Sequence, residues 1–353
     1  MNQEKLLDAI ADRDMFSHLK SALKDAGLPV SRGWDLTREQ LLDVMDMKPD
    51  GDTHFHELQN IYKENLLYAD KAVMLWSADR EDLNNFTRQL ESILRPDHSY
   101  TLPYPAPLGV EELKAQTENF IPVKIYESHK KRTVVFCSRR WINEQVTILN
   151  SDLKEEILAS YADIPEFFGK RKITFQVFDS LTLHAETGLV ELRIDRAKHM
   201  PEKQIKQLCV LAQARINAYA EACGIKEFLK LPLNLYEAIG HIYKDRSLII
   251  KNLQHQNDAG FDNTNRGRSK KLDVRNDDYH SGGERSVPSI DIYGITALLP
   301  IFQNGSPSII LNGHSKLLAQ QQSFIDYVKI LDCWNFSTYT YTLGRVLQYL
   351  PYS

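Results

Sequence analysis

Apolar side chains recur at helical spacing throughout residues 1–95. Leucines, isoleucines and methionines repeat every three or four positions there, which is the period of amphipathic helices. Gly27, with a proline two residues later, is expected to end the first run, because glycine adopts the left-handed cap and proline cannot continue a helix. Further helices are expected over 54–77 and 80–94. The pattern predicts an all-helical N-terminal domain over 1–95.

The pattern changes after a stretch that contains four prolines, residues 96–111. Each proline disfavours helix in the residue before it, so we interpret this stretch as an extended, Pro-rich linker. Beyond it, apolar and polar residues alternate, as they do in strands with one buried face. Residues 173–183 and 189–195 are expected to pair as a hairpin, because a glycine lies in the short link between them.

The remainder mixes both patterns and predicts the fold class. Helices are expected over 201–224, 234–245 and 315–332, and strands around 123–126, 133–137, 290–295 and 309–311. The predicted fold is α+β: an all-helical N-terminal domain followed by an antiparallel-sheet body flanked by helices, over 112–353.

One stretch of the body, residues 254–288, is rich in Asn, Asp, Gly, Arg and Ser and nearly free of large apolar groups. A segment of this composition buries too little surface to offset its ordering entropy. We therefore expect a flexible insertion there.

Composition narrows the class of protein only slightly. The chain has 353 residues, 42% hydrophobic and 25% charged, with a formal net charge of −4, so a polyanion site has to be a local patch. The four cysteines form no CxxC pair, and buried reduced thiols are expected. Without an apolar signal core or an 18-residue apolar run, we expect a cytoplasmic protein, or a nuclear one if the source is a eukaryote, with no membrane association.

The predicted hairpin carries one candidate catalytic set. Asp179 lies on the first strand, and Glu191 and Arg193 lie on the second. The set resembles the acidic pair followed by lysine in metal-dependent nucleases of the restriction-enzyme type, but arginine deprotonates too reluctantly to act as a base. A charged solvent face on a half-buried hairpin explains the same residues. The nuclease is therefore kept as an alternative.

Other catalytic and cofactor patterns are weak or missing. His54 and His56 could share a metal on a strand, but the local pattern is helical, and two positions on a helix point about 200° apart. The sequence has no GxSxG elbow, no GxxxxGK[ST] loop and no GxGxxG after a strand. We expect no cofactor and no metal, and we lean towards a protein that is not an enzyme.

Basic residues suggest binding to nucleic acid. A run within the predicted insertion places five cations in ten residues: Arg266, Arg268, Lys270, Lys271 and Arg275. Cations on a flexible arm can follow a phosphate backbone. Residues 19–33, from Leu19-Lys20-Ser21-Ala22-Leu23-Lys24 through Gly27-Leu28-Pro29 to Ser31-Arg32-Gly33, resemble the first half of a SAP module, a small DNA-binding unit. That resemblance implies phosphate contacts by Lys20, Lys24 and Arg32.

The sequence thus favours a non-enzymatic nucleic-acid-binding or adaptor subunit of a larger complex, with DNA or RNA and another protein as partners. A divergent metal-dependent nuclease using the 173–195 hairpin and a protein–protein scaffold remain alternatives.

Overall fold

The computed structural model describes residues 1–13, 16–47, 49–128 and 131–350. Its described part is an α+β fold, as the sequence predicts, built on one long antiparallel sheet. The ten strands run in the order β2-β3-β4-β5-β1-β10-β9-β8-β6-β7, and every neighbouring pair is antiparallel. Strands that are far apart in the sequence meet in the middle of this sheet, where β1 pairs with β10.

The described part of the N-terminal segment consists of helices and the turns between them up to residue 68. It folds into α1 (Gln3–Asp12), α2 (Phe16–Asp25), α3 (Trp34–Asp46) and α4 (Gly51–Tyr68). Gly27 has a φ of +68°, the left-handed conformation expected after α2.

The expectation of helix throughout 1–95 is wrong for β1 (Lys71–Ser77), which precedes α5 (Arg80–Ile93). Residues 71–76 are all buried, so β1 is a central strand covered on both faces. An apolar run of this kind lacks the alternation that would have distinguished it from helix.

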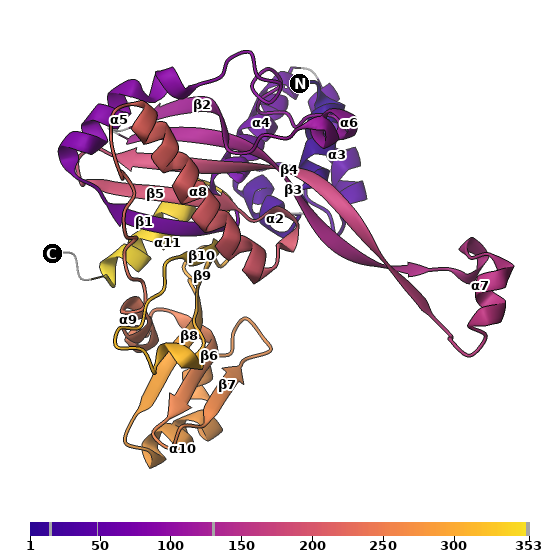
Figure 1. Ribbon diagram of the computed structural model, residues 1–353. Helices are drawn as coiled ribbons and strands as arrows, with labels where there is room; N and C mark the ends of the chain where they lie inside the picture. Colours follow the sequence, from indigo (N-terminus) through magenta and orange to yellow (C-terminus); the bar gives the residue numbers. More distant parts are fainter. Residues whose placement is uncertain (14–15, 48, 129–130, 351–353) are drawn as a thin grey trace.

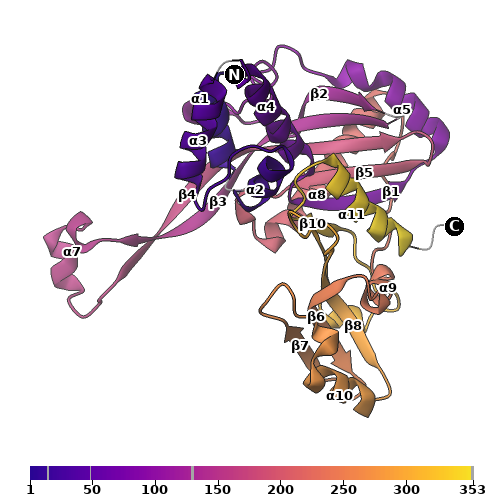
Figure 2. The ribbon, with the colours of Figure 1, turned by 180° about the vertical axis from the view of Figure 1, so that it is seen from behind.

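Helices cover both faces of the β1 region. Ala72, Met74 and Trp76 pack against α5 and α8 (Glu202–Ala222), which cross one face in Figure 1. Val73 and Leu75 point to the other face and pack with α11 (Phe336–Gln348). Figure 2 shows α1–α4 and α11 on that opposite side.

Two strands continue beyond the body as an arm. β3 (Lys131–Ile148) and β4 (Phe167–His184) pair along their whole length, from Lys131 opposite His184 to Ile148 opposite Phe167. Their outer ends, with the short helix α7 (Glu155–Ser160) between them, stand clear of the body in Figures 1 and 2. The rest of this half of the sheet comprises β2 (Ile121–Ser128) and β5 (Leu189–Asp195).

The other half of the sheet projects below the body in Figure 1. We call this projecting part the distal lobe. It consists of β6 (Ile249–Asn257), β7 (Asp262–Arg266), β8 (Ile290–Leu298), α9 (Ala238–Lys244) and α10 (Asp278–Ser286). β9 (Ser308–Asn312) and β10 (Val328–Leu331) connect it to β1. The predicted unstructured insertion 254–288 is therefore wrong as to structure: most of it forms β6, β7, a turn of 3-10 helix at Val274–Asn276, and α10.

Two further expectations need correction. Residues 96–111 are not an extended linker: they fold as consecutive turns around the buried Tyr100 and lead into α6 (Val110–Ala115). Residues 315–332 contain one 3-10 turn and β10 instead of a helix. The division into separately folding domains stays a prediction. No helix in the described part of the chain is both long and apolar enough to cross a membrane.

Candidate functional site in the arm and the distal lobe

The candidate catalytic set of the β4–β5 hairpin lies inside the protein. Asp179 is fully buried, and Glu191 and Arg193 expose 3% and 2% of their surfaces. The predicted alternation is confirmed, since Val190, Leu192 and Ile194 share the opposite face. The charged face does not meet solvent, however, because α4 and α11 cover it. The interpretation of a solvated surface is wrong.

Each member of the set has a structural partner. Glu191 lies 3.2 Å from both His184 and Arg193, and it accepts a hydrogen bond from the Tyr339 hydroxyl of α11. Arg193 also donates to the Leu67 carbonyl and lies against the rings of Tyr68 and Tyr339. Burial opposes ionisation of Glu191, but the Arg193 guanidinium and His184 outweigh it and lower its pKa to about 2.

Asp179 belongs to a second buried network, one strand away. It lies 2.5 Å from Arg140 and accepts the backbone N–H of Asp195. Burial raises the pKa of the Asp179 carboxyl despite that arginine. Asp195 in turn accepts from Arg13 of the N-terminal segment and from Lys71 of β1. These groups join five separate segments, and both carboxylates are buried and bonded to groups of the protein itself.

Among the described residues, no group of three or more His, Cys, Asp or Glu side chains is arranged to hold a metal ion. His54 and His56 both lie on α4, and the side chains of two helical residues at this spacing point in different directions. The geometry therefore gives no support to the nuclease alternative.

The basic run after β7 forms an ordered loop that we call the basic loop, residues 266–272. Lys251 of β6 anchors it by donating to the carbonyls of Gly267, Ser269 and Leu272. Four cations are exposed and form no ion pair within the described chain: Arg266, Arg268, Lys270 and Lys271. Three of them line a hollow of about 660 Å³ beside the loop. The loop is thus held in shape while its charges stay available.

Arg275 does not belong with these four cations. It is buried, pairs with Asp273 at 2.6 Å, and donates to the backbone carbonyls of Tyr243, Asp245 and Leu248. These hydrogen bonds from the Arg275 guanidinium join the loop to the end of α9. Its assignment as a phosphate contact is wrong on this geometry.

The three cations of the SAP-like segment lie on and after α2. Lys24 and Arg32 are exposed, and the Lys20 ammonium lies 4.5 Å over the Phe16 ring and 3.3 Å from the Arg32 carbonyl. Lys270 of the basic loop lies near enough to His18 of α2 for their charges to interact. The two basic segments therefore approach each other, although their contact with nucleic acid stays a prediction.

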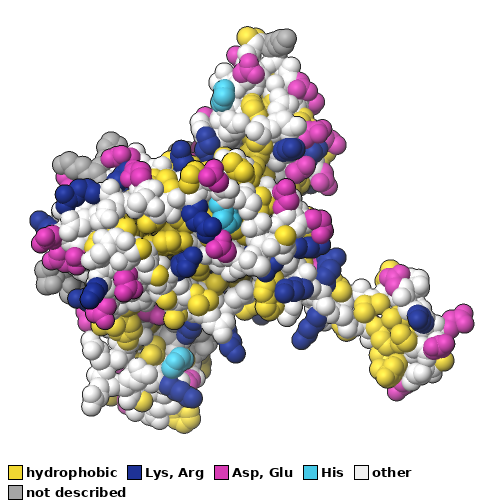
Figure 3. Space-filling view, turned by 45° about the horizontal axis from the view of Figure 1, so that its top comes forward, with side chains coloured by type: hydrophobic (Ala, Val, Ile, Leu, Met, Phe, Trp, Pro, Cys, Tyr) yellow, Lys and Arg dark blue, Asp and Glu magenta, His cyan; other side chains and the backbone are white. Residues whose placement is uncertain are grey.

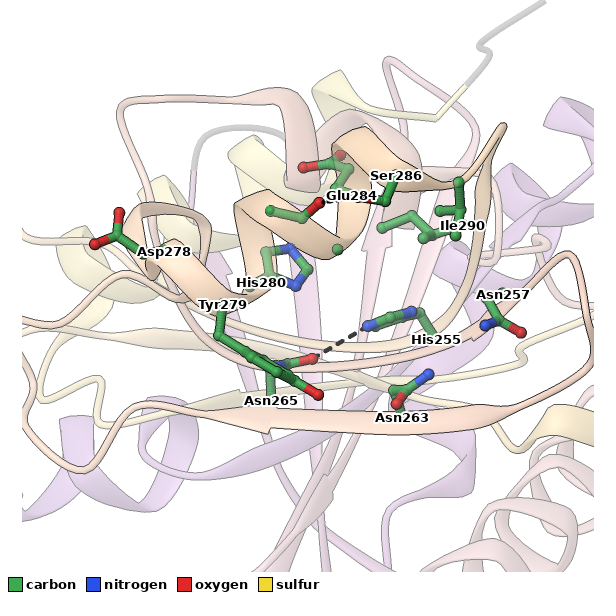
Figure 4. Close-up of a pocket in the computed structure, with 13 residues that line it drawn as sticks. His255, Asn257, Asn263, Asn265, Asp278, Tyr279, His280, Glu284, Ser286 and Ile290 are labelled. Atoms are coloured by element: carbon green, nitrogen blue, oxygen red, sulfur yellow. Dashed lines mark hydrogen bonds between the residues drawn. The ribbon is translucent and has the colours of Figure 1, made fainter.

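A pocket of about 560 Å³ opens in the distal lobe between α10 and the strands β6 and β7, and we call it the distal pocket. Figure 4 shows His255, Asn263 and Asn265 rising from the strand side, with Tyr279, His280 and Glu284 on α10 opposite them. The two imidazole rings meet edge to face, with centroids 5.6 Å apart. Sequence reasoning missed this site. The available signal was the polar, Asn-rich composition of 254–288, which was interpreted as flexibility instead.

The end of the arm is an unusual apolar surface. Its large apolar side chains expose between 39% and 62% of their area: Leu149, Ile157, Tyr161, Ile164 and Phe168. Figure 3 shows these yellow side chains gathered at the end of the arm, with magenta acidic groups beside them and dark blue basic groups where the arm leaves the body. Between Leu149 and Phe168, five acidic residues stand against one lysine. We call this surface the arm tip.

Comparisons with known proteins add no family assignment. The chain matches no protein-family model, and no curated protein is significantly similar to it in sequence.

Proposed function

We propose that the protein is a non-enzymatic adaptor subunit that docks a partner protein through the arm tip. The observation that carries this proposal is the exposure of five large apolar side chains at the end of a projecting arm. Contiguous apolar surface that is rimmed by polar groups marks interaction sites on soluble proteins. A site on a projecting ribbon can enter a groove that the body itself could not reach.

The rim of the arm tip defines the chemistry of the partner. The acidic excess over residues 149–168 favours an apolar groove flanked by lysines or arginines. The described part of the protein's own surface includes a groove of this character, about 400 Å³ between β3 and α8, lined by Arg139, Leu211 and Arg215. Self-association is therefore the competing outcome that the experiment has to separate.

The test replaces Ile157, Tyr161 and Phe168 together by serine in the full-length protein. The control replaces three apolar residues elsewhere that are more exposed still, Leu36, Leu102 and Leu231, by serine. The partner is first identified by photocrosslinking from position 161 in source cells and is then titrated in purified form. The arm variant should bind at least about 100-fold more weakly, since a few anchor residues carry most of an interface's energy.

Two results would overturn the adaptor proposal. Equal affinity of wild type and arm variant for the partner would show that the arm tip does not contribute to binding. A concentration-dependent dimer in sedimentation, abolished by the arm variant and kept by the control, would make the arm a self-association device.

A second candidate function is binding of nucleic acid by the basic loop. The specific observation is that Lys251 holds the loop while four cations remain exposed, with no ion pair to another described residue. Replacing Arg266, Arg268, Lys270 and Lys271 by alanine should weaken binding to a labelled single strand. The log–log salt slope should fall by up to roughly 3, at about 0.7 per lost contact.

The matched control for this test removes four exposed lysines on and after α8: Lys203, Lys206, Lys226 and Lys230. It should leave the salt slope nearly unchanged. An equal loss in both variants would mean that binding follows overall charge and not the loop.

A further inference from the structure

The two histidines of the distal pocket have assignable tautomers. The Tyr243 hydroxyl has one proton, which it donates to Glu284 Oε1 at 3.1 Å. His280 Nε2, also 3.1 Å from that hydroxyl, must then be the donor. The proton of neutral His280 is thereby fixed on Nε2, and its Nδ1 is an acceptor.

His255 reaches the same state by a different contact. Its Nε2 lies 3.1 Å from Asn265 Oδ1, which only accepts, so Nε2 carries the proton. Its Nδ1 is buried in a residue that is only 7% exposed, and it has no hydrogen-bond partner among the described residues. A buried acceptor left without a partner is costly, which points to a donor group supplied by a ligand.

The asparagines of the pocket supply complementary donors and acceptors. Asn265 uses its carbonyl oxygen for His255, which leaves its amide N–H groups for a ligand. Asn263 donates its amide to the Phe261 carbonyl, which leaves its own carbonyl oxygen. The strand side therefore presents donors and acceptors next to the two imidazole acceptors. A planar group with an amino substituent beside a ring nitrogen matches this set.

Charge decides which part of a ligand enters. Glu284 and Asp278 line the distal pocket, so an anionic group is disfavoured inside it. The neighbouring hollow at the basic loop shares Asn265 and Asp278 with the pocket and presents Arg266, Arg268 and Lys271. An uncharged base in the pocket would thus place its phosphate beside the loop cations. Tyr279, 85% exposed at the rim, offers a ring for stacking.

We propose that the distal pocket binds an unstacked base of a single-stranded nucleic acid and prefers bases with an exocyclic amino group, adenine or cytosine. The phosphates of the same strand lie on the basic loop. This inference rests on the second candidate function and adds base selection to it. A single strand is required because the base must leave its stack to enter.

The experiment uses the full-length protein and labelled oligonucleotides of about 12 residues, which fit the usual site sizes. Oligo(dA) and oligo(dT) carry equal backbone charge, but thymine has no exocyclic amino group. Wild type should bind oligo(dA) at least about 10-fold more tightly, within the range of one good base-edge contact. Asn265→Leu should bring the two affinities together.

Tyr279→Ala tests stacking without disturbing the core, since the side chain is exposed. It should cost about 10-fold or more for oligo(dA) with an unchanged melting temperature. Tyr341→Ala on α11, another exposed tyrosine, is the matched control, and it should leave oligo(dA) binding unchanged.

The outcomes separate the base site from the loop. Equal, salt-dependent binding of both oligonucleotides overturns the base site and leaves the loop candidate standing. No binding of either one overturns both. Adenosine monophosphate that competes as tightly as oligo(dA) assigns the pocket to a free nucleotide and overturns the strand; weaker competition supports the strand.

Discussion

Arg13 and Asp195 form a two-point ion pair across 182 positions of sequence. Arg13 Nη1 and Nη2 lie 3.1 and 3.0 Å from the two carboxylate oxygens, and both residues are buried. Lys71 reaches the same carboxylate at 2.7 Å. The pair joins the chain after α1 to the end of β5. The helical N-terminal segment is therefore held to the sheet by this ion pair as well as by apolar packing.

Arg13→Met should therefore destabilise the protein strongly. Asp195 would keep only Lys71 as a side-chain cation, and removing one partner of a buried pair costs about 3–5 kcal/mol. Urea unfolding followed by circular dichroism measures this loss. Arg38→Met is the control, because its pair with Asp8 is exposed and should contribute about 0–1 kcal/mol. A loss below about 1 kcal/mol for Arg13→Met would contradict the role given to the pair.

Glu191→Gln should also unfold the protein more easily. From the sequence, Glu191 is a solvated residue whose replacement changes stability by about 0.5 kcal/mol at most. The structure revises this, because Arg193 would be left buried beside an uncharged amide, at about 3–5 kcal/mol. Glu111→Gln removes an exposed pair with Lys114 and provides the comparison. Equal unfolding midpoints for the two variants would restore the sequence-based interpretation.

The contribution of Glu191 should depend on pH in a defined direction. Burial disfavours the carboxylate, but Arg193 and His184 prevail and lower the pKa from its ordinary 4.5 to about 2. A carboxyl with a depressed pKa stabilises the fold above its unfolded value and loses that contribution as pH falls. The stability gap between wild type and Glu191→Gln should be full near pH 6 and should narrow from pH 4.5 towards 2. Unfolding curves at several pH values measure it, and a gap that widens on acidification would contradict this cause.

Lys251→Met should loosen the basic loop. The ammonium is the group that joins the carbonyls of Gly267 and Leu272, so its loss should raise local opening. Limited trypsin digestion, followed by mass spectrometry, should show faster cleavage after Lys270 and Lys271. Lys244→Met, an exposed change at the end of α9, should leave those rates unchanged. If both variants are cleaved at the wild-type rate, the loop does not depend on Lys251.

Native alkylation should modify one cysteine first. Burial raises the pKa of the thiols of Cys137, Cys209 and Cys333, and all three are inaccessible. Cys223, at the end of α8, is partly exposed. Iodoacetamide on the folded protein should label Cys223 alone, and all four should react in denaturant. Early labelling of Cys209 would show that α8 leaves the sheet more readily than its packing implies.

Local pattern predicted those elements that have one apolar face and clear ends. The hairpin expected over 173–195 corresponds to the inner part of β4 and to β5, and the helix expected over 201–224 corresponds to α8. The hairpin shows alternation and the helix shows 3.6-residue spacing. Each pattern arises because one face of the element packs in the apolar core and the other face contacts water or polar side chains. β1 could not be predicted in this way, because a strand that is buried on both faces has no polar face and therefore no alternation of apolar and polar residues.

The sequence by itself determined the fold class, the hairpin, the long helix and the location of the four exposed loop cations. Tertiary structure alone decided that Glu191 faces Arg193 and Tyr339 inside the protein. The sequence pattern of a charged strand face is the same whether water or α11 covers that face. It also decided that His255 and His280, 25 positions apart, meet across a pocket. Hydrogen bonds among Asn, His and Tyr side chains position the two rings, and such contacts leave no periodic pattern along the chain.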